Sequence, residues 1–438
     1  MKKHWYSIAL TCLIIVFIIL AYELIRSTFF KEGDFKGYLE AGNLVLSGKD
    51  IYLNPRINTW LPFFSILSVP LSLVGNISAP LVRFLWMACT VGAVFFIIHH
   101  LTTGFLNRRL VWIPKRKEPL ISDTIIALLH PVVLVPLLIA MRYIMDNMAN
   151  LQINIFMLLL ALLSIRYFAQ KKEGLAGFLL ALSISIKVYT IFLLFYFIVK
   201  REFKTAGYTV LFLILMAALP FLVFGIETTL QYYETWYANN VEPFASVGHK
   251  NQSFFSMMRS LLMHESPGIN QPLNMEIYLN IFHLDLISTR WISYLIVVIL
   301  GVVGVWFMGE KITERQHAKT YLGFVFILTI IPLLSPLAWK GYFIFLWPAW
   351  FVQYILLFRV DTGLPDRTRG VLKILFLMAV AMTVFSSELF IGKHLSRLLE
   401  AFSVITIGTI LAAVVQFILY CRLDGKKLSN ALLNINSS

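Results

Sequence analysis

Long runs of apolar residues, separated by short polar segments, dominate the chain from one end to the other. A bilayer core of about 30 Å is crossed by about 20 residues of α-helix. Apolar runs of about this length recur throughout the sequence, so the pattern predicts an all-α polytopic membrane protein.

We expect about a dozen membrane helices in one transmembrane domain, residues 1–438. Most are continuous apolar runs, and a further stretch, 174–199, carries basic residues at both ends, such as Lys172 and Lys200. Since both ends then lie on one side of the membrane, we expect two short helices with a bend near Lys187. The continuous spans are expected at residues 5–26, 78–101, 121–140, 150–168, 206–225, 290–308, 321–336, 341–358, 373–391 and 401–420.

The composition agrees with this class: 59% of the residues are hydrophobic, 14% are charged and the mean hydropathy is +0.78. Three cysteines and 15% aromatic residues exclude a disulfide scaffold and a disordered chain. The formal net charge of +14 comes from loops on one side of the predicted topology, which the positive-inside rule makes cytoplasmic. Both termini are then cytoplasmic, the expected location is the inner or plasma membrane, and no nucleic-acid partner is indicated.

Two long segments, 27–77 and 226–289, fall on the extracytoplasmic side. Long segments in compact proteins are usually functional or disordered, and aromatic residues such as Trp236 and Tyr237 argue against disorder. We therefore expect the chemistry to lie in these two segments, in contact with membrane lipids.

The first extracytoplasmic segment contains two predicted short helices. Apolar residues at helical spacing after Asp34 predict an amphipathic helix on the membrane surface. A second apolar stretch, bounded by Pro62 and Pro70 and too short to span, predicts an interfacial or re-entrant helix. An aspartate at a helix start is most often an N-cap. Asp34 could instead serve as a general base just outside the bilayer, and both interpretations stay open.

Ionisable residues within or beside the membrane are functional candidates, because their burial is costly. Lys187 could reach the outer half of the protein from its bend, or form a structural pair with a carboxylate. Lys250, Arg259 and Lys340 are predicted on the extracytoplasmic side, where cations could bind a phosphate. Each could equally be a side chain that reaches toward lipid headgroups.

Several known catalytic patterns are missing from the sequence. It has no H-x-x-x-H or C-x-x-C metal pattern, no phosphate-binding P-loop and no nucleophile-elbow G-x-S-x-G. We expect no metal and no cofactor, and ATP-driven transport and serine-hydrolase chemistry lack support.

Several elements resemble, in order, those of glycosyltransferase family 87, membrane transferases of the GT-C superfamily. The resemblance runs from the first span to about residue 357. Its elements are Asp34, Tyr38, Ala41, Gly48-x-Asp50-x-Tyr52, the helix from Pro62 to Leu71, Gln152-x-Asn154, Lys187-x-Tyr189, Asn251-Gln252-Ser253 with Arg259, and Ser335-Pro336-x-x-Trp339. The chain departs from the family where Phe63 and Thr190 replace prolines and Leu151 replaces a glycine. Lys340-Gly341-Tyr342 also stands where the family often has a histidine.

The resemblance implies a GT-C-like bundle and the transfer of mannose, or a related hexose, from a polyprenyl-phosphate sugar to a lipid or glycan acceptor. It further implies inverting, single-displacement chemistry with Asp34 as the base. The expected donor-phosphate contacts are Arg259, Lys187, Lys340 and Lys250. The expected substrate contacts are Tyr38, Tyr52, Gln152, Asn154, Tyr189, Asn251, Gln252, Ser253 and Trp339.

Two other classes of function are alternatives to a transferase. A lipid-linked-sugar flippase or secondary transporter predicts paired broken helices and ionisable residues at the membrane midplane, whereas the sequence offers one broken hairpin and an acid outside the bilayer. A non-catalytic assembly subunit would tolerate the loss of Asp34.

Overall fold

The computed structural model describes residues 2–54, 58–106, 128–241, 244–268, 276–312 and 318–425, together with 428 and 432. The described residues form helices and no strand, so the all-helical class is confirmed. The start of the predicted span 121–140 lies outside the described residues.

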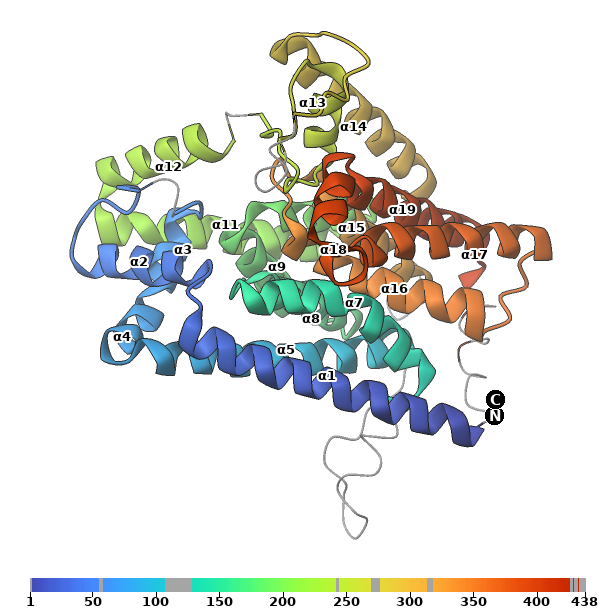
Figure 1. Ribbon diagram of the computed structural model, residues 1–438. Coiled ribbons are helices and arrows are strands. Elements are labelled where there is room, and N and C mark those ends of the chain that lie inside the picture. The colour runs from blue at the N-terminus through green and yellow to red at the C-terminus, as the bar shows by residue number, and fades with distance from the viewer. Residues whose placement is uncertain are drawn as a thin grey trace.

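The α-helices follow one another in a single bundle (Figure 1). They are α1 (Lys2–Phe30), α2 (Phe35–Leu46), α3 (Pro62–Leu67), α4 (Val69–Ile77), α5 (Ala79–Phe105), α7 (Pro131–Ala149), α8 (Asn154–Ala169), α9 (Glu173–Ile186), α10 (Phe192–Val199), α11 (Phe203–Phe224), α12 (Ile226–Asn240), α13 (Phe254–Leu262), α14 (Leu286–Met308), α15 (Ala318–Leu334), α16 (Trp347–Tyr354), α17 (Asp366–Val380), α18 (Glu388–Ala401) and α19 (Val404–Arg422). Tighter 3-10 helices are η1 (Val188–Ile191) and η2 (Lys340–Leu346), and wider π-helical turns are η3 (Ile355–Arg359) and η4 (Ala381–Phe385).

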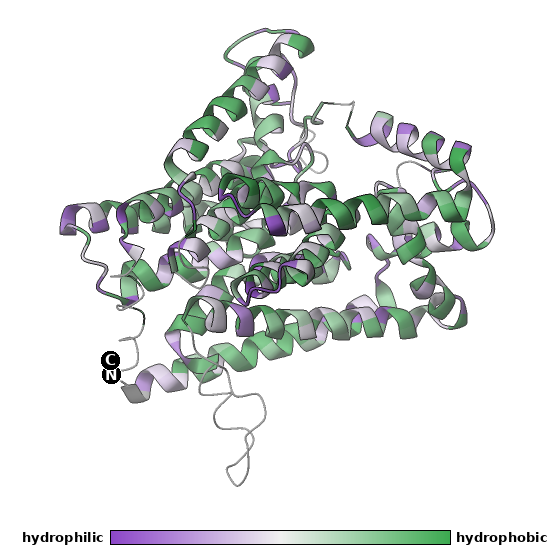
Figure 2. Cartoon of the chain, turned by 180° about the vertical axis from the view of Figure 1, so that it is seen from behind, coloured by the Kyte–Doolittle hydropathy of each residue, from purple (hydrophilic) through white to green (hydrophobic). Residues whose placement is uncertain are grey.

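Eight helical segments in the described part of the chain are long and apolar enough to cross a bilayer. They begin at His4, Ala79, Pro131, Phe203, Leu286, Lys340, Asp366 and Val404. Shorter apolar helices, α8, α9, α10 and α15, pack among them. Figure 2 shows apolar colour along most of the long helices and hydrophilic colour at many of their ends. The polytopic membrane class is confirmed, and the count of about twelve membrane helices stays a prediction.

The segment from Lys340 to Arg359 lies at the centre of the bundle. In its most apolar part 83% of the residues are buried, whereas in α14 only 11% are. Helix α14 presents apolar side chains such as Trp306 outward. The helices α7, α8 and α15 pack around the central segment, whose Trp347 and Trp350 are fully enclosed. Residues at the start of this segment are therefore held from several sides.

Two expected boundaries are wrong. Helix α7 begins at Pro131, where a proline with no N–H suits the first helical turn, and continues to Ala149, past the expected end of the span at residue 140. The predicted span 373–391 ends at Phe385, and a separate helix, α18, follows it. Helix α18 has a strong polar face and bends at Gly392, and the sequence analysis did not anticipate it.

The predicted hairpin at 174–199 is confirmed in its local structure. Helix α9 ends at Ile186, Lys187 is extended (φ −143°, ψ 119°), and η1 begins at the next residue. The extended backbone interrupts the helical hydrogen bonds at Lys187, so its side chain leaves the hairpin at the break.

The described part of the segment 27–77 folds largely as short helices at one end of the bundle (Figure 1). Helix α2 begins directly after Asp34, as predicted, and the proline-bounded stretch forms α3 and α4, which meet at Ser68. The Ser72 hydroxyl donates a 2.8 Å hydrogen bond to the Leu39 carbonyl and so joins α4 to α2. Tyr38 is fully buried against aromatic rings, with Trp60 at a centroid distance of 4.8 Å. Asp34 therefore stands where a packed surface layer meets the bundle.

Candidate active site

Asp34 occupies the N-cap position of α2, but its carboxylate makes no capping hydrogen bond. Its backbone N–H donates instead to the Asn150 carbonyl, 2.9 Å away at the end of α7. The carboxylate accepts a hydrogen bond from the Gln152 side chain and faces the charge of Lys187. Burial raises the pKa of the Asp34 carboxyl above its ordinary value, while Lys187 and Gln152 oppose part of that rise. A raised pKa makes the carboxylate a stronger base.

Asn154 connects the two short motifs that the sequence singled out. Its Oδ1 accepts hydrogen bonds from Lys187 Nζ at 3.1 Å and from the Tyr189 hydroxyl at 2.9 Å. Its Nδ2 donates to Gln152 Oε1 at 3.1 Å and to Asn147 Oδ1 at 3.0 Å. A single amide thus orients both the lysine and the residue that contacts Asp34.

The turn at the start of η2 closes this group. The Gly341 carbonyl accepts a hydrogen bond from Asn147 Nδ2 at 2.8 Å, and a Cβ at this position would overlap Gln152 Oε1. The Tyr342 hydroxyl lies 3.4 Å from Lys187 Nζ, which also sits 4.6 Å from the centre of the Tyr342 ring. Gly341 is required because a side chain would displace the glutamine that contacts Asp34.

Tyr342 is a site residue that the sequence analysis did not select. Tyr342 lies two residues after Lys340, in the segment that departs from the family pattern. That departure was the feature of the sequence that could have drawn attention to it. Its ring packs on Tyr189 with centroids 4.8 Å apart. The two aromatic rings flank the ammonium of Lys187, which lies 6.0 Å from the centre of the Tyr189 ring.

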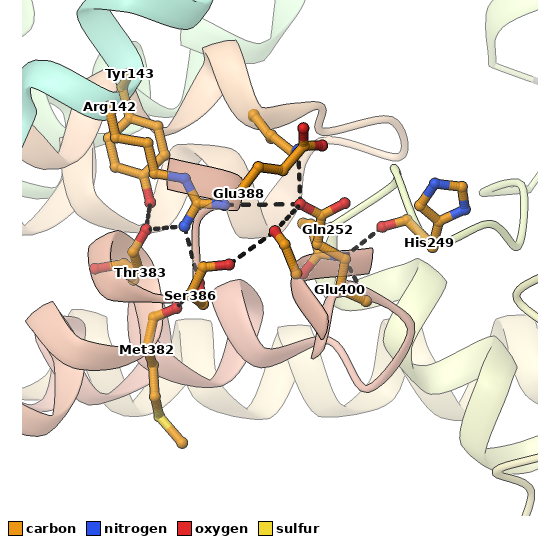
Figure 3. Close-up of polar contacts among 11 residues, drawn as sticks. Arg142, Tyr143, His249, Gln252, Met382, Thr383, Ser386, Glu388 and Glu400 are labelled. Atoms are coloured by element: carbon orange, nitrogen blue, oxygen red, sulfur yellow. Dashed lines mark hydrogen bonds and ion pairs between the residues drawn. The ribbon is translucent and has the colours of Figure 1, made fainter. Parts of the chain in front are cut away.

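Lys340 belongs to a second, ionic group beside the first. Its Nζ lies 2.7 Å from Glu400 Oε1 and 3.8 Å from Glu388 Oε1. Arg142 Nη2 approaches the same Glu400 oxygen at 3.6 Å, and Figure 3 shows Arg142, Glu388 and Glu400 converging. Glu400 was absent from the predicted site, because it lies some 60 residues after Lys340 on the helix that the sequence analysis missed.

The Asn251-Gln252-Ser253 motif is attached to the Ser335-to-Trp339 motif. Asn251 Nδ2 donates to the Pro336 carbonyl at 3.1 Å, and Asn251 Oδ1 accepts the N–H of Ala338 at 2.9 Å. The Gln252 N–H donates to the Ala338 carbonyl at 2.8 Å, and Ser253 caps α13 through the N–H of Ser256. These contacts fix the backbone immediately before Lys340. Trp339 itself keeps 44% of its surface exposed.

The remaining predicted site residues lie apart from this group. Tyr52 is buried and donates a 2.7 Å hydrogen bond to the Trp60 carbonyl, within the first segment. Arg259 forms an ion pair with Glu265 (Nε to Oε2, 2.7 Å) and donates to the Ala245 carbonyl. Lys250 is exposed. The structure thus brings together Asp34, Gln152, Asn154, Lys187 and Tyr189, with Tyr38 and Lys340 adjoining.

Leu151 stands where the family usually has glycine. The backbone at this position adopts a conformation that favours glycine. Its φ of +48° lies in the left-handed region, which costs a residue with a Cβ roughly 1–2 kcal/mol. The Leu151 side chain is fully buried, and burying a leucine contributes about 1.5–3 kcal/mol. Burial therefore offsets the strain, and the turn into Gln152 keeps its shape.

A metal site is not evident among the described residues, where no three His, Cys, Asp or Glu side chains gather as ligands. Metal independence stays a prediction. The group contains the partly buried Asp34 carboxylate, which contacts the Gln152 amide and faces Lys187, and the ionic group of Lys340 lies beside it.

These features define a polytopic membrane protein with a carboxylate and cations in one polar group. The profile of glycosyltransferase family 87 matches residues 59–336. The chain therefore belongs to glycosyltransferase family 87 and is a membrane glycosyltransferase, consistent with the GT-C superfamily. No curated protein and no solved structure matches the chain significantly. Asp34 precedes the matched segment and Lys340 follows it, so the structure, rather than the match, relates these two residues to Lys187.

Proposed function

We propose that the protein transfers a hexose, most simply mannose, from a polyprenyl-phosphate sugar to a hydroxyl of a lipid or glycan acceptor. The transfer takes place on the extracytoplasmic face of the plasma membrane, with both termini in the cytoplasm. The observation that carries the proposal is the Asp34 carboxylate, which leaves its helix uncapped and accepts a hydrogen bond from Gln152 beside Lys187.

The reaction is a single displacement with inversion at the sugar. The acceptor oxygen forms a bond to the anomeric carbon as the bond from that carbon to the phosphate oxygen breaks. The hydroxyl proton passes to the Asp34 carboxylate and afterwards to solvent. The leaving group is the polyprenyl phosphate, which keeps the electron pair of the broken bond. A base with a raised pKa suits this proton transfer.

Negative charge grows on the phosphate as it leaves, and nearby cations stabilise it. Lys187 is the first candidate, because it stands beside Asp34. Its hydrogen-bond partners are Asn154 and Tyr342, and no carboxylate of the described residues is in hydrogen-bonding contact with it. Lys340 is the second, two residues from Tyr342. Arg259 and Lys250 stay proposals for donor recognition from the second extracytoplasmic segment.

The substrate contacts proposed from the family resemblance fall into two kinds. Trp339 is exposed and can contact a lipid or a sugar directly. The other eight are buried. Seven of them are hydrogen-bonded and in this conformation orient neighbouring groups: Tyr52, Gln152, Asn154, Tyr189, Asn251, Gln252 and Ser253. Tyr38 packs among aromatic rings.

The test is a reconstituted transfer assay with polyprenyl-phosphate hexoses, comparing wild type, Asp34→Asn and Glu32→Gln. Loss of a general base lowers the rate by about 10²–10⁴-fold, and we expect Asp34→Asn to fall in this range with an unchanged thermal midpoint. Glu32 is a matched control, because it is a nearby carboxylate whose pair with Lys36 is exposed. We expect Glu32→Gln to transfer within about twofold of wild type, since exposed pairs contribute little.

Wild-type transfer by Asp34→Asn would show that another group is the base. If the wild-type protein consumes none of the lipid-phosphate sugars offered, the donor class is wrong.

A further inference from the structure

We propose that Glu400 is a positioning residue that holds the Lys340 ammonium where it can contact the donor phosphate. The inference rests on the proposed function and deepens it, because it assigns a role to a helix that follows the family-matched segment. It concerns the ionic group of Lys340, Arg142, Glu388 and Glu400, of which the last three are labelled in Figure 3.

Glu400 is the buried member of this group. The residue is 2% exposed, whereas the Lys340 side chain is 23% exposed and the Glu388 side chain 47% exposed. Its Oε1 lies 2.7 Å from Lys340 Nζ, a charge-assisted hydrogen-bond distance. The Lys340 ammonium is therefore bound by Glu400 on its buried side, and its other side is accessible to a ligand.

The anchor itself is fixed by several contacts. The backbone carbonyl of Glu400 accepts hydrogen bonds from Gln252 Nε2 at 2.7 Å and from the N–H of Ser403 at 2.9 Å. Arg142, which approaches the same carboxylate, donates to Ser386 Oγ at 2.8 Å and to the Thr383 carbonyl. The C-terminal end of α18 and the turn before its N-terminal end are thus tied to the bundle, and the carboxylate has little freedom to follow a moving lysine.

The Lys340 ammonium keeps N–H donors available for an anion. Two cations, Lys340 and Arg142, face two carboxylates, Glu388 and Glu400, so these four side chains carry no net charge, and Asp146 also faces both cations. An ammonium has three N–H donors, and the Glu400 contact uses one of them. A phosphate can then take another without breaking the pair.

The position of Lys340 also affects the Asp34 group through the backbone. Lys340 is the first residue of η2, the next residue is packed against Gln152, and Tyr342 contacts Lys187. Any shift of the Lys340 backbone therefore reaches Lys187 within two residues.

Positioning and simple charge make opposite predictions for Glu400→Gln. If only net charge mattered, removal of a carboxylate would make the group more positive and would lower the KM for the donor. If Glu400 positions Lys340, the freed ammonium turns toward other acids such as Glu388, and the donor KM rises. The acceptor KM stays within about twofold in the positioning case.

The experiment is a double-mutant cycle of Glu400→Gln, Lys340→Met and the double variant in the reconstituted transfer assay, with a control, Glu310→Gln. Glu310 pairs with Lys319 from a side chain that is 77% exposed. We expect each single variant of the pair to lose at least about tenfold in kcat/KM for the donor, the double variant to lose no more than Lys340→Met alone, and Glu310→Gln to match wild type.

The inference would be overturned if the double variant lost the product of the two single-variant losses in kcat/KM. A lowered donor KM in Glu400→Gln would also overturn it. Glu400→Gln leaves two cations close together and can unfold, so Glu400→Asp is the second variant. Aspartate keeps the negative charge, but its side chain is one methylene group shorter, so the carboxylate lies farther from Lys340. We expect a raised donor KM with a thermal midpoint near that of wild type. A donor KM equal to that of wild type in Glu400→Asp would also overturn the inference. Absence of transfer by the wild-type protein would instead count against the proposed function.

Discussion

The backbone N–H of Asp34 donates a 2.9 Å hydrogen bond to the Asn150 carbonyl, which ties the start of α2 to the end of α7. The contact depends on Gly33, whose φ of +50° lies in the left-handed region and whose missing Cβ leaves room for that carbonyl. A close backbone approach, rather than a helix cap, therefore determines where the Asp34 carboxylate lies.

Replacement of Gly33 by alanine is expected to displace Asp34. The new Cβ would overlap the backbone of Asn150, which cannot move as a flexible side chain can. We expect transfer to fall at least tenfold and the thermal midpoint to fall as well. Gly48→Ala is the matched control, because Gly48 has a similar φ of +62° but an open surrounding. It should cost only about 1–2 kcal/mol of backbone strain, with transfer retained, and equal activity losses in both variants would contradict the role given to the Asn150 contact.

The pH dependence of transfer should report the Asp34 carboxyl. The base is active when deprotonated, so the rate falls as pH drops through its pKa, which burial raises above the ordinary aspartate value. The acidic limb of log kcat/KM should therefore lie above the usual aspartate range. Lys187 lowers this pKa, so Lys187→Met should move the limb to still higher pH, in addition to any loss of rate.

The position of the limb separates this effect from weaker donor binding, which lowers the whole profile without shifting it. A profile that keeps its wild-type limb in Lys187→Met would show that the lysine does not act on the titrating group. Asp34→Glu is a useful companion, because it should retain an acidic limb.

Arg259 and Glu265 form an ion pair that is also hydrogen-bonded, with Nη2 donating to Oε1 at 2.8 Å. We expect Arg259→Met and Glu265→Gln to lower the thermal midpoint by similar amounts, because each variant breaks the same pair. If Arg259 also contacts the donor, Arg259→Met must raise the donor KM, whereas Glu265→Gln must leave the donor KM unchanged. Equal donor KM values in the two variants would leave Arg259 with a structural role alone.

Orientation in the membrane can be measured by cysteine labelling in intact cells. Asn239 and Gln170 are exposed, at the end of α12 and after α8. In a background without Cys12, Cys89 and Cys421, we expect Asn239→Cys to react with a membrane-impermeant maleimide from outside. Gln170→Cys should react only after the cells are permeabilised. The reverse pattern would place the proposed site on the cytoplasmic side.

The local sequence pattern was sufficient to predict those parts of the site whose residues are close together in the chain. The break at Lys187 followed from basic residues at both ends of a short apolar stretch, and α2 followed from helical spacing after Asp34. The interpretation of Asp34 stayed open between cap and base, because both place an aspartate at a helix start. The structure shows that the Asp34 carboxylate makes no capping hydrogen bond and contacts Gln152, more than a hundred residues away, and its role as a base stays a proposal.

The sequence by itself determined the all-helical membrane class, most of the spans and the family, since the length of apolar runs and the order of short motifs are local properties. Tertiary structure alone decided which charged side chains meet. Lys340 and Glu400 belong to different helices, and their pairing depends on how α18 bends at Gly392 and docks on the bundle. Hydrophobic periodicity specifies which face of a helix is buried, but the partner of a buried charge is chosen by three-dimensional packing, which no local pattern encodes.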